Sequence, residues 1–229
     1  MTEQHYQVAI DGPAASGKST AARLLAARLG GYYVNTGDMY RAVAWAALKA
    51  GVDPVTQPEK VIKLLPGWDL RYRVQPGQKQ TLQLCLNGQV LQPEEFRMPE
   101  VTAVVSQVAS IPALREWMLD RQRECDRLGI VIMEGRDIGT VIFPQARFKF
   151  FITASPEERA RRRFAQRGEV AADATLAAVA AEIAARDHLD SIRAVAPLRP
   201  APDALLVNTD GRTQDEVADW LAAYIREQQ

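Results

Sequence analysis

Short apolar runs alternate with amphipathic stretches along most of this chain. Runs rich in β-branched or aromatic residues predict buried strands at 8–10, 32–34, 130–133, 148–152 and 204–207. Helical patterns follow at 19–29 and 37–50, and a last one ends near Arg226. Strands that alternate with helices are typical of βαβ units. The pattern therefore predicts an α/β fold in which helices flank a five-stranded parallel sheet.

The alternation changes between about residues 67 and 91. Residues 68–74 and 81–86 alternate with a period of two, and Asn87-Gly88 is a strong hairpin signal. We therefore expect a small antiparallel β insertion at about 67–100, within a core formed by residues 1–66 and 101–229.

The loop after the first strand has a spacing that suits phosphate binding. Gly12 is followed by four residues and then by Gly17-Lys18-Ser19. Small residues let the chain turn so tightly that backbone N–H groups face a phosphate, with a helix N-terminus behind them. A chance turn is the alternative, but strand, loop and helix fall where a triphosphate cradle needs them. We expect Lys18 to reach the β- and γ-phosphates and Ser19 to bind Mg²⁺. The predicted cradle comprises Gly12, Pro13, Ala14, Ala15, Ser16, Gly17, Lys18, Ser19 and Thr20.

Charge and composition narrow the class of protein. The chain has 28 basic and 28 acidic residues, a balance that argues against a general nucleic-acid binder. Most basic residues are arginines, which suit bidentate phosphate recognition, although surface salt bridges or a GC-rich coding sequence would give the same bias. Residues 1–7 lack a basic leader and no apolar run reaches membrane-spanning length. We expect a cytoplasmic protein without a membrane partner, in which Cys85 and Cys125 are reduced thiols.

Polar residues follow two of the predicted strands, at the edge where open parallel sheets bind ligands. Thr36 and Arg41 follow the strand at 32–34. Thr36 can cap the next helix or contact a ligand, and Arg41 would face the cradle.

The second polar group follows the strand at 130–133. Glu134 takes the position of a carboxylate that holds Mg²⁺ directly or through water in cradle-type nucleotide enzymes. Arg136 and Asp137 come next, between two glycines. They either project into the site or form a salt bridge with each other.

Two later helical stretches carry arginines. The first, about 156–170, is predicted to be a short helical lid on which Arg159 and Arg163 share a face toward a transferring phosphoryl group. In the second, Arg186 and Asp190 lie one turn apart, as ligand contacts or as an intrahelical ion pair, and Arg193 extends roughly the same side. The remaining polar residues of these stretches are expected in solvent, namely Arg161, Arg162, Arg167 and His188.

Taken together, these motifs resemble those of bacterial cytidylate kinases, within the nucleoside monophosphate kinases. The resemblance rests on the cradle, Asn35-Thr-Gly-Asp-Met-Tyr-Arg41, Ser106-Gln-Val-Ala, Glu134-Gly-Arg-Asp-Ile-Gly-Thr-Val-Ile-Phe-Pro144 and Arg186-Asp-x-x-Asp-x-x-Arg-Ala-Val-Ala-Pro197-Leu, which span essentially the whole chain. It implies a P-loop kinase core, a nucleoside monophosphate-binding insertion, a closing lid, and phosphorylation of CMP and dCMP that requires ATP and Mg²⁺. Two departures are Asp38, where the motif usually has a small residue, and His188-Leu189, which replaces a more charged pair.

The resemblance also implies which residues surround the pyrimidine nucleotide. They are Thr36, Arg41, Ser106, Arg115, Arg136, Asp137, Arg186, Asp190 and Arg193. The exocyclic amine of cytosine donates, so Asp137 or Ser106 would accept from it, whereas N3 and O2 need donors such as Arg115 or Arg193.

The expected chemistry agrees with the abundance of arginine. A phosphate acceptor is already ionised, so the enzyme needs cations that align two anions and needs no general base. The residues expected to act on the transfer are Lys18, Arg136, Arg159, Arg163 and Arg186. A hydroxyl kinase would instead use Asp38 or Asp137 as a base. A nucleotide-dependent switch would carry a water-positioning Gln loop, of which the sequence gives no clear example. Short loops and a small lid favour a monomer.

Overall fold

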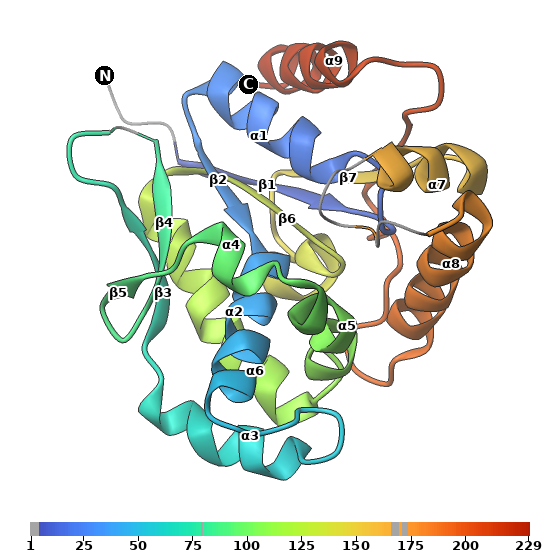
Figure 1. Ribbon diagram of the computed structural model, residues 1–229. Helices are drawn as coiled ribbons and strands as arrows, with labels where there is room; N and C mark the ends of the chain where they lie inside the picture. The colour runs from blue at the N-terminus through green and yellow to red at the C-terminus, as the bar shows by residue number, and fades with distance from the viewer. Residues whose placement is uncertain (1–4, 79, 166–169, 171–173) are drawn as a thin grey trace. The chain divides into compact units, whose positions relative to one another are not determined.

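The structure is a computed structural model that describes residues 5–78, 80–165, 170 and 174–229. The chain packs into two compact units (Figure 1). The first comprises Met1–Asn35 and Asp126–Gln229, and the second comprises Thr36–Cys125. The boundaries near 67 and 100 expected from the sequence fall inside the second unit, so the division into a core and an insertion at 67–100 stays a prediction.

A five-stranded parallel sheet forms the centre of the first unit. Its order is β2 (Tyr32–Asn35), β6 (Ile130–Gly135), β1 (Tyr6–Asp11), β7 (Phe148–Thr153) and β8 (Leu205–Asn208). Each apolar run expected to be a strand forms one of these five, which confirms the predicted fold class. Asp11 pairs in register with Gly135, so the loops that follow β1 and β6 leave the sheet next to each other.

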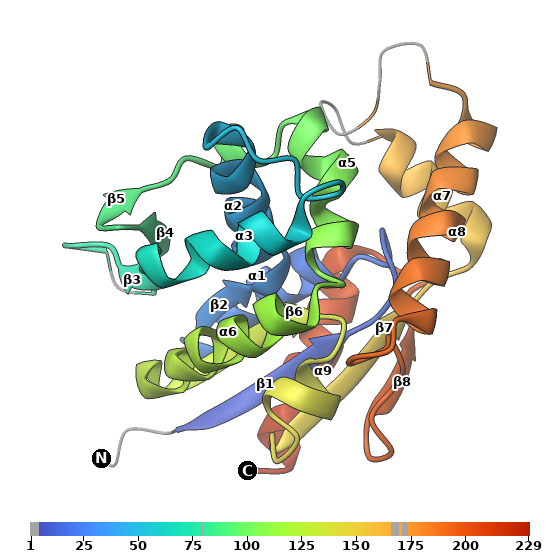
Figure 2. The same ribbon diagram turned by 90° about the horizontal axis from the view of Figure 1, so that it is seen from below.

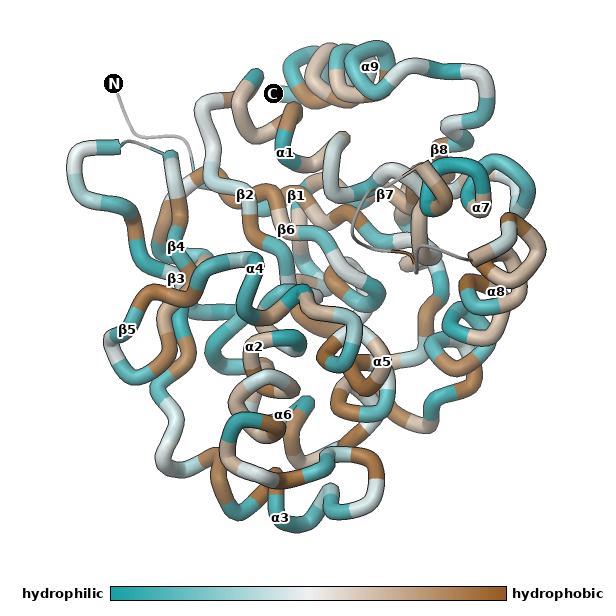
Figure 3. The backbone as a smooth tube through the Cα atoms, viewed as in Figure 1, coloured by the Kyte–Doolittle hydropathy of each residue, from teal (hydrophilic) through white to brown (hydrophobic). Residues whose placement is uncertain are grey.

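The core of the first unit lies between this sheet and two helices. Helix α1 (Lys18–Leu29) packs beside α9 (Gln214–Glu227), and both contribute to one cluster with the strands. Leu25 and Leu221 are fully buried against Val8 and Phe150. Figure 3 shows brown, hydrophobic stretches along β1 and β6, as expected of strands covered on both faces. Each such buried side chain stabilises the fold by about 1.5–3 kcal/mol.

Two further helices of the first unit, α7 (Pro156–Ala165) and α8 (Leu176–Ile192), pack against each other (Figure 2). Helix α7 accounts for most of the span predicted as a lid. Residues 166–169 of that span, including Arg167, lie outside the described residues. Short turns of helix occur at η2 (Glu124–Leu128) and at η3 (Ile138–Ile142), a π-helical turn that directly follows Asp137.

The second unit contains a three-stranded antiparallel sheet, β3 (Leu70–Val74), β4 (Leu82–Leu86) and β5 (Gln89–Val90). Asn87 and Gly88 have φ values of 51° and 82° in the turn between β4 and β5, which confirms the hairpin signal. The helices are α2 (Thr36–Lys49), α3 (Pro58–Leu64), η1 (Leu65–Gly67), α4 (Pro93–Phe96), α5 (Pro99–Val108) and α6 (Pro112–Arg123).

Proline marks where most helices of the second unit begin. Pro58, Pro93, Pro99 and Pro112 each occupy a first helical position, where the missing N–H costs nothing. The helices and the small sheet share one hydrophobic core, which includes Met39, Val61, Leu70, Leu114 and Met118. Over the described chain, no helix has both the length and the apolar character needed to cross a bilayer.

Candidate functional site

The phosphate cradle begins where β1 ends, and its glycines are required by the backbone. Gly12 has a φ of 148°, and a Cβ atom there would lie 2.0 Å from the carbonyl oxygen of Ile152. Gly17 has a φ of 90° and precedes α1 as its N-cap, without a side chain that caps the helix. The first N–H groups of α1 therefore keep their capacity to bind an anion. The structure thus has the loop geometry that the spacing of Gly12 and Gly17 predicts.

Lys18 is a buried cation at the start of α1. Its side chain is 5% exposed, and Nζ donates a hydrogen bond to the carbonyl oxygen of Pro13 at 2.6 Å. Burial, together with the nearby positive charge of Arg136, lowers the pKa of Lys18 to about 7 even though Glu134 opposes the shift. A phosphate at this position would give the Lys18 ammonium an anionic partner in place of the neutral carbonyl oxygen of Pro13.

Helices α7 and α8 hold the middle of the cradle. The backbone N–H of Ala14 donates to Oδ1 of Asp187 on α8 at 2.8 Å. Arg159 on α7 donates to the carbonyl oxygen of Ala14 at 3.2 Å and forms an ion pair with the same Asp187. The Ala14 side chain also packs against Val179 and Ile183. Both helices therefore grip the third residue of the loop, through its backbone and its side chain.

Arg162 also belongs to the cradle, so the expectation that it lies in solvent is wrong. It donates to the carbonyl oxygen of Ser16 at 3.3 Å and to Oγ1 and the carbonyl oxygen of Thr209 at 2.8 and 2.9 Å. Arg161 has a side chain 72% exposed and pairs with Glu158, as expected of a surface residue. The missed signal is spacing, because Arg162 lies three residues after Arg159 and so shares its helix face.

Glu134, the second-last residue of β6, is a buried carboxylate, 4% exposed. Its Oε1 accepts a hydrogen bond from the Tyr33 hydroxyl at 2.9 Å, and Asn35 donates to that hydroxyl at 3.2 Å. Sequence reasoning did not identify Tyr33, whose position within a strand looks purely structural. The bond fixes one carboxylate oxygen and holds Glu134 in one orientation.

The donor set of the cradle fits Mg²⁺. Ser19 is exposed in the first turn of α1, and Glu134 lies close enough to Lys18 to raise its pKa. A hydroxyl and a carboxylate are hard oxygen donors, and Mg²⁺ usually takes only one or two protein ligands, with phosphates and water as the others. Within the described part of the chain, no group of three or more His, Cys, Asp or Glu residues could hold a metal by itself.

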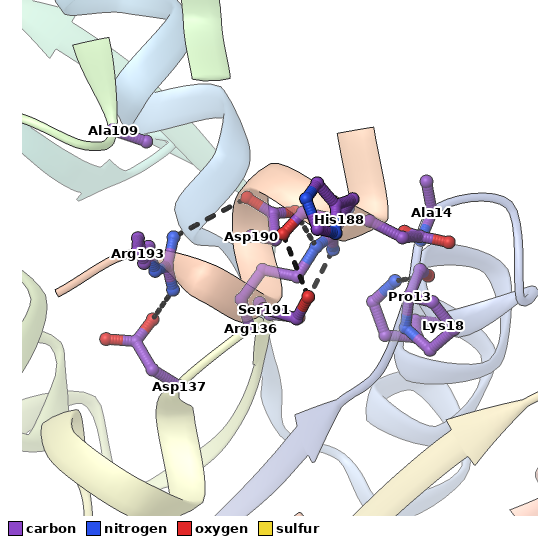
Figure 4. Close-up of polar contacts among 12 residues, drawn as sticks. Pro13, Ala14, Lys18, Ala109, Arg136, Asp137, His188, Asp190, Ser191 and Arg193 are labelled. Carbon is purple, nitrogen blue, oxygen red and sulfur yellow. Dashed lines mark hydrogen bonds and ion pairs between the residues drawn. The ribbon is translucent and has the colours of Figure 1, made fainter. Parts of the chain in front are cut away.

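Four charged residues form a second group in the first unit, which we call the arginine–aspartate cluster (Figure 4). Arg136 Nε donates to Asp190 at 2.8 Å, and Arg193 lies 3.6 Å from both Asp190 and Asp137. The side chains of Asp137, Asp190 and Arg193 are 8% exposed or less. Arg136 thus contacts α8 through Asp190, and Asp137 contacts its C-cap residue, Arg193. These four residues carry two positive and two negative charges.

Asp190 is the centre of this cluster. Burial raises its pKa, but the charges of Arg136, Arg186 and Arg193 and the bond from Arg136 outweigh that effect and leave the pKa below its ordinary value. Asp190 is therefore ionised at neutral pH. Arg186 acts on it from one turn away on α8. The structure thus brings together Arg136, Asp137, Arg186, Asp190 and Arg193, whose expected role around a nucleotide stays a prediction.

His188 is exposed on α8, as expected, and its carbonyl oxygen accepts a hydrogen bond from the Ser191 hydroxyl at 2.8 Å (Figure 4). Arg163 is half-buried on α7. Its expected role at a transferring phosphoryl group stays a prediction.

The second unit carries the other residues predicted to contact substrate. Helix α2 begins at Thr36, which is buried. On the same helix Asp38 lies 3.6 Å from Arg41, and its other oxygen accepts from Arg97 at 2.6 Å. The carboxylate that departs from the family motif is thus compensated by two arginines.

Ser106 and Arg115 occupy α5 and α6. Ser106 is half-buried. Arg115 is 7% exposed, donates to the carbonyl oxygen of Ala109 at 3.0 Å and lies with its guanidinium carbon 5.5 Å from the centre of the Tyr40 ring. Both contacts hold the guanidinium in a fixed position, as a residue that recognises a ligand requires.

Comparison with known proteins identifies the relatives of this chain. The family model described as cytidylate kinase matches residues 8–227. A cytidylate kinase from Desulforamulus reducens is 44% identical, with 98% of each chain covered. One from Symbiobacterium thermophilum is 43% identical, with 96% of this chain and 95% of that protein covered. A bifunctional pantoate ligase/cytidylate kinase from a Synechococcus strain is 42% identical over 96% of this chain, which spans 40% of that longer relative.

Proposed function

The chain belongs to the cytidylate kinase family, and we propose that it transfers the γ-phosphoryl group of ATP to CMP or dCMP, giving CDP or dCDP. The observation that carries this proposal is the pairing of a phosphate cradle with a buried, charge-balanced cluster that contains two arginines. The cradle suits the donor. The cluster suits an acceptor that is itself an anion and also carries polar base and sugar groups.

The cradle residues 12–20 would hold the phosphates of ATP. Lys18 would move from Pro13 to the β- and γ-phosphate oxygens, because a phosphate binds an ammonium more strongly than a carbonyl oxygen does. Ser19 and Glu134 would hold Mg²⁺, Glu134 either directly or through water. When bound, Mg²⁺ neutralises charge on the β- and γ-phosphates.

The acceptor would be bound by residues carried over from the family pattern one by one. Thr36 and Arg41 suit its phosphate, since both lie in the first turns of α2, where the helix dipole favours an anion. Arg136, Arg186, Asp190 and Arg193 suit the phosphate and the ribose, and Ser106 and Arg115 suit the base.

Cytosine would be selected by hydrogen-bond polarity. Asp137 is buried and beside Arg193, so it can accept from the exocyclic amine of cytosine while Arg193 or Arg115 donates to N3 or O2. Uracil reverses two of these polarities. A buried donor or acceptor left without its partner costs about 1–3 kcal/mol, enough for a clear preference.

The transfer itself would need alignment and no general base. Arg159, Arg163, Arg136 and Arg186 would stabilise the charge on the transferring phosphoryl group. Asp38 and Asp137, the bases that a hydroxyl kinase of this fold would need, both lie beside arginines. Each of these carboxylates is therefore already engaged by a cation, an arrangement that favours the phosphate acceptor.

A coupled assay with ATP and separate acceptors tests the proposal. CMP and dCMP should be phosphorylated, UMP more slowly, and AMP and shikimate hardly at all. ATP turnover without an acceptor should be negligible. Rapid turnover of ATP alone would favour a nucleotide-dependent switch, and phosphorylation of shikimate would favour a hydroxyl kinase.

Variants within the second unit test the predicted role of Arg41 in binding the acceptor. Arg41→Ala should raise the KM for CMP far more than the KM for ATP. Arg73, an exposed arginine on β3, offers the matched control, since Arg73→Ala removes the same charge from a surface position. We also propose that the protein works as a cytoplasmic monomer on free nucleotides, in keeping with its balanced charge.

A further inference from the structure

Asp11 is a buried carboxylate that none of the roles above uses. It is the last residue of β1, directly before the first glycine of the cradle, and is 3% exposed. Its Oδ1 accepts from the backbone N–H of Ile138 and its Oδ2 from the backbone N–H of Gly139, each at 2.8 Å. One side chain therefore connects the cradle to the turn that follows Arg136 and Asp137.

These two bonds take the place of the side-chain cap that the π-helical turn η3 lacks at its N-terminus. The first N–H groups of any helical turn lack partners within it, and the residue before the turn usually satisfies them. Here that residue is Asp137, a good capping residue, yet its side chain makes no cap bond. Asp137 instead lies beside Arg193, in the arginine–aspartate cluster. Asp11 caps the turn and thereby leaves Asp137 in the cluster.

The packing around Gly139 shows that this contact is close. A Cβ atom on Gly139 would lie 3.4 Å from Oδ2 of Asp11 and 3.2 Å from Cδ of Lys149. Burial is the main cause of a net rise in the pKa of Asp11 to about 7; the two N–H bonds and Lys18 oppose this rise, and the charge of Asp137 adds to it. A carboxylate kept in so unfavourable an environment needs a structural reason, and the two N–H donors provide it.

We propose that Asp11 is a positioning residue that holds the Arg136–Asp137 segment in register with the phosphate cradle. This inference rests on the proposed function, because it couples the donor site to the acceptor site. Loss of the bonds would let Arg136 and Asp137 shift. A displacement of about 1 Å in such groups costs about 100-fold in rate.

Asp11→Asn is the direct test. It keeps the size of the side chain but turns one acceptor oxygen into an NH₂ group that faces an N–H donor. With CMP, kcat should fall about 10- to 100-fold, while the KM for ATP changes less than about threefold, because the N–H groups of the cradle remain. The preference for CMP over UMP in kcat/KM should also fall, since Asp137 would no longer be held in place.

Two controls separate positioning from charge and from stability. Asp53 is an exposed aspartate that accepts the backbone N–H of Val55 at 2.9 Å, so Asp53→Asn makes the same change elsewhere and should leave the kinetics unchanged. Val207→Ala removes buried volume from β8 and should lower thermal stability without altering the CMP to UMP ratio. A ratio that falls equally in Val207→Ala and Asp11→Asn would overturn the proposal.

Amide hydrogen exchange gives a readout that does not depend on catalysis. In Asp11→Asn without nucleotide, Ile138 and Gly139 should lose protection while β7 keeps it. Unchanged protection at both residues would overturn the positioning role, whatever the substrate. If the native protein phosphorylates CMP and Asp11→Asn keeps its kcat and its CMP to UMP ratio, positioning fails while the proposed function stands. If the native protein phosphorylates no nucleoside monophosphate, the proposed function fails and hydrogen exchange alone decides.

Discussion

The cradle and the arginine–aspartate cluster are both buried polar sites of the first unit, yet they are built differently. In the cradle, backbone groups dominate. Lys18 donates a hydrogen bond to a carbonyl oxygen, and among the described residues it forms no ion pair at hydrogen-bond distance. In the cluster, side chains dominate, and two arginines balance two aspartates. The Lys18 ammonium thus has no close carboxylate partner in the described part of the chain, whereas the arginines of the cluster already have such partners.

Helix α8 connects the two sites through two aspartates three residues apart. Asp187 contacts Ala14 of the cradle and Arg159 of α7, and Asp190 contacts Arg136 and Arg193 in the cluster. An anionic ligand can therefore bind the Lys18 ammonium of the cradle without breaking an ion pair. In the cluster, a ligand must replace ion pairs that already exist. Substitutions in the two sites should therefore have different kinetic signatures.

The largest effect is expected for Lys18→Met. Phosphoryl transfer should fall at least about 10²- to 10³-fold, because a major electrostatic contact with the transition state is lost. The fold should become more stable at neutral pH, since burial lowers the pKa of Lys18 from 10.5 to about 7. A lysine with a lowered pKa costs the fold nothing above pH 10.5, and the cost grows as the pH falls from 10.5 to about 7, below which it is complete.

Urea unfolding of Lys18→Met and the native protein at several pH values checks this sign. The gain in the free energy of unfolding should be largest at or below pH 7 and should shrink toward pH 10. A variant that is less stable than the native protein at pH 7 would show that Lys18 supports the fold and would overturn this prediction.

Asp190→Asn should have the next largest effect, confined to the acceptor. It leaves Arg136 and Arg193 with one carboxylate fewer in a buried site, so kcat/KM for CMP should fall about 100-fold while the KM for ATP stays near its native value. Asp219→Asn is the matched control, because Asp219 pairs with Arg28 at the surface and should affect neither substrate. If Asp190→Asn impaired the use of ATP as much as the use of CMP, the prediction that the cluster serves only the acceptor would be wrong.

Asp187→Asn should show the opposite selectivity at about a tenfold level. The amide can still accept from the N–H of Ala14 but no longer pairs with Arg159 as a charge, so the KM for ATP should rise and that for CMP should not. Steady-state kinetics with each substrate varied in turn measures both values. A larger change in the KM for CMP would place Asp187 with the cluster.

The different construction of the two sites also explains what the sequence predicted. Gly12, Gly17 and Lys18 act through local backbone geometry, so their spacing was sufficient. The five strands were found because each is a short apolar run between helical patterns. Partners across long separations were not found, because residue type does not specify pairing: Arg162 with Thr209, Asp187 with Ala14, and Asp11 with Gly139.

The cluster shows the same limit in another form. Its members were predicted by type and by position after β6 and on α8. The sequence left open whether Arg136 would pair with Asp137 or Arg186 with Asp190. Only the fold shows that Arg136 reaches Asp190 and that Asp137 lies beside Arg193.

Asp38→Ala extends the comparison to the second unit and should have the smallest effect. Asp38 balances Arg97 and Arg41 just as Asp190 balances the cluster, but here the carboxylate stands where the family motif usually has a small residue. An acceptor phosphate must compete with it for Arg41. Its removal should lower the KM for CMP about threefold, which corresponds to well under 1.4 kcal/mol. The double variant Asp38→Ala with Arg97→Ala should return the KM close to native, because the local net charge is restored. A KM that rises in the single variant would mean that Asp38 orients Arg41 for the acceptor and does not compete with it.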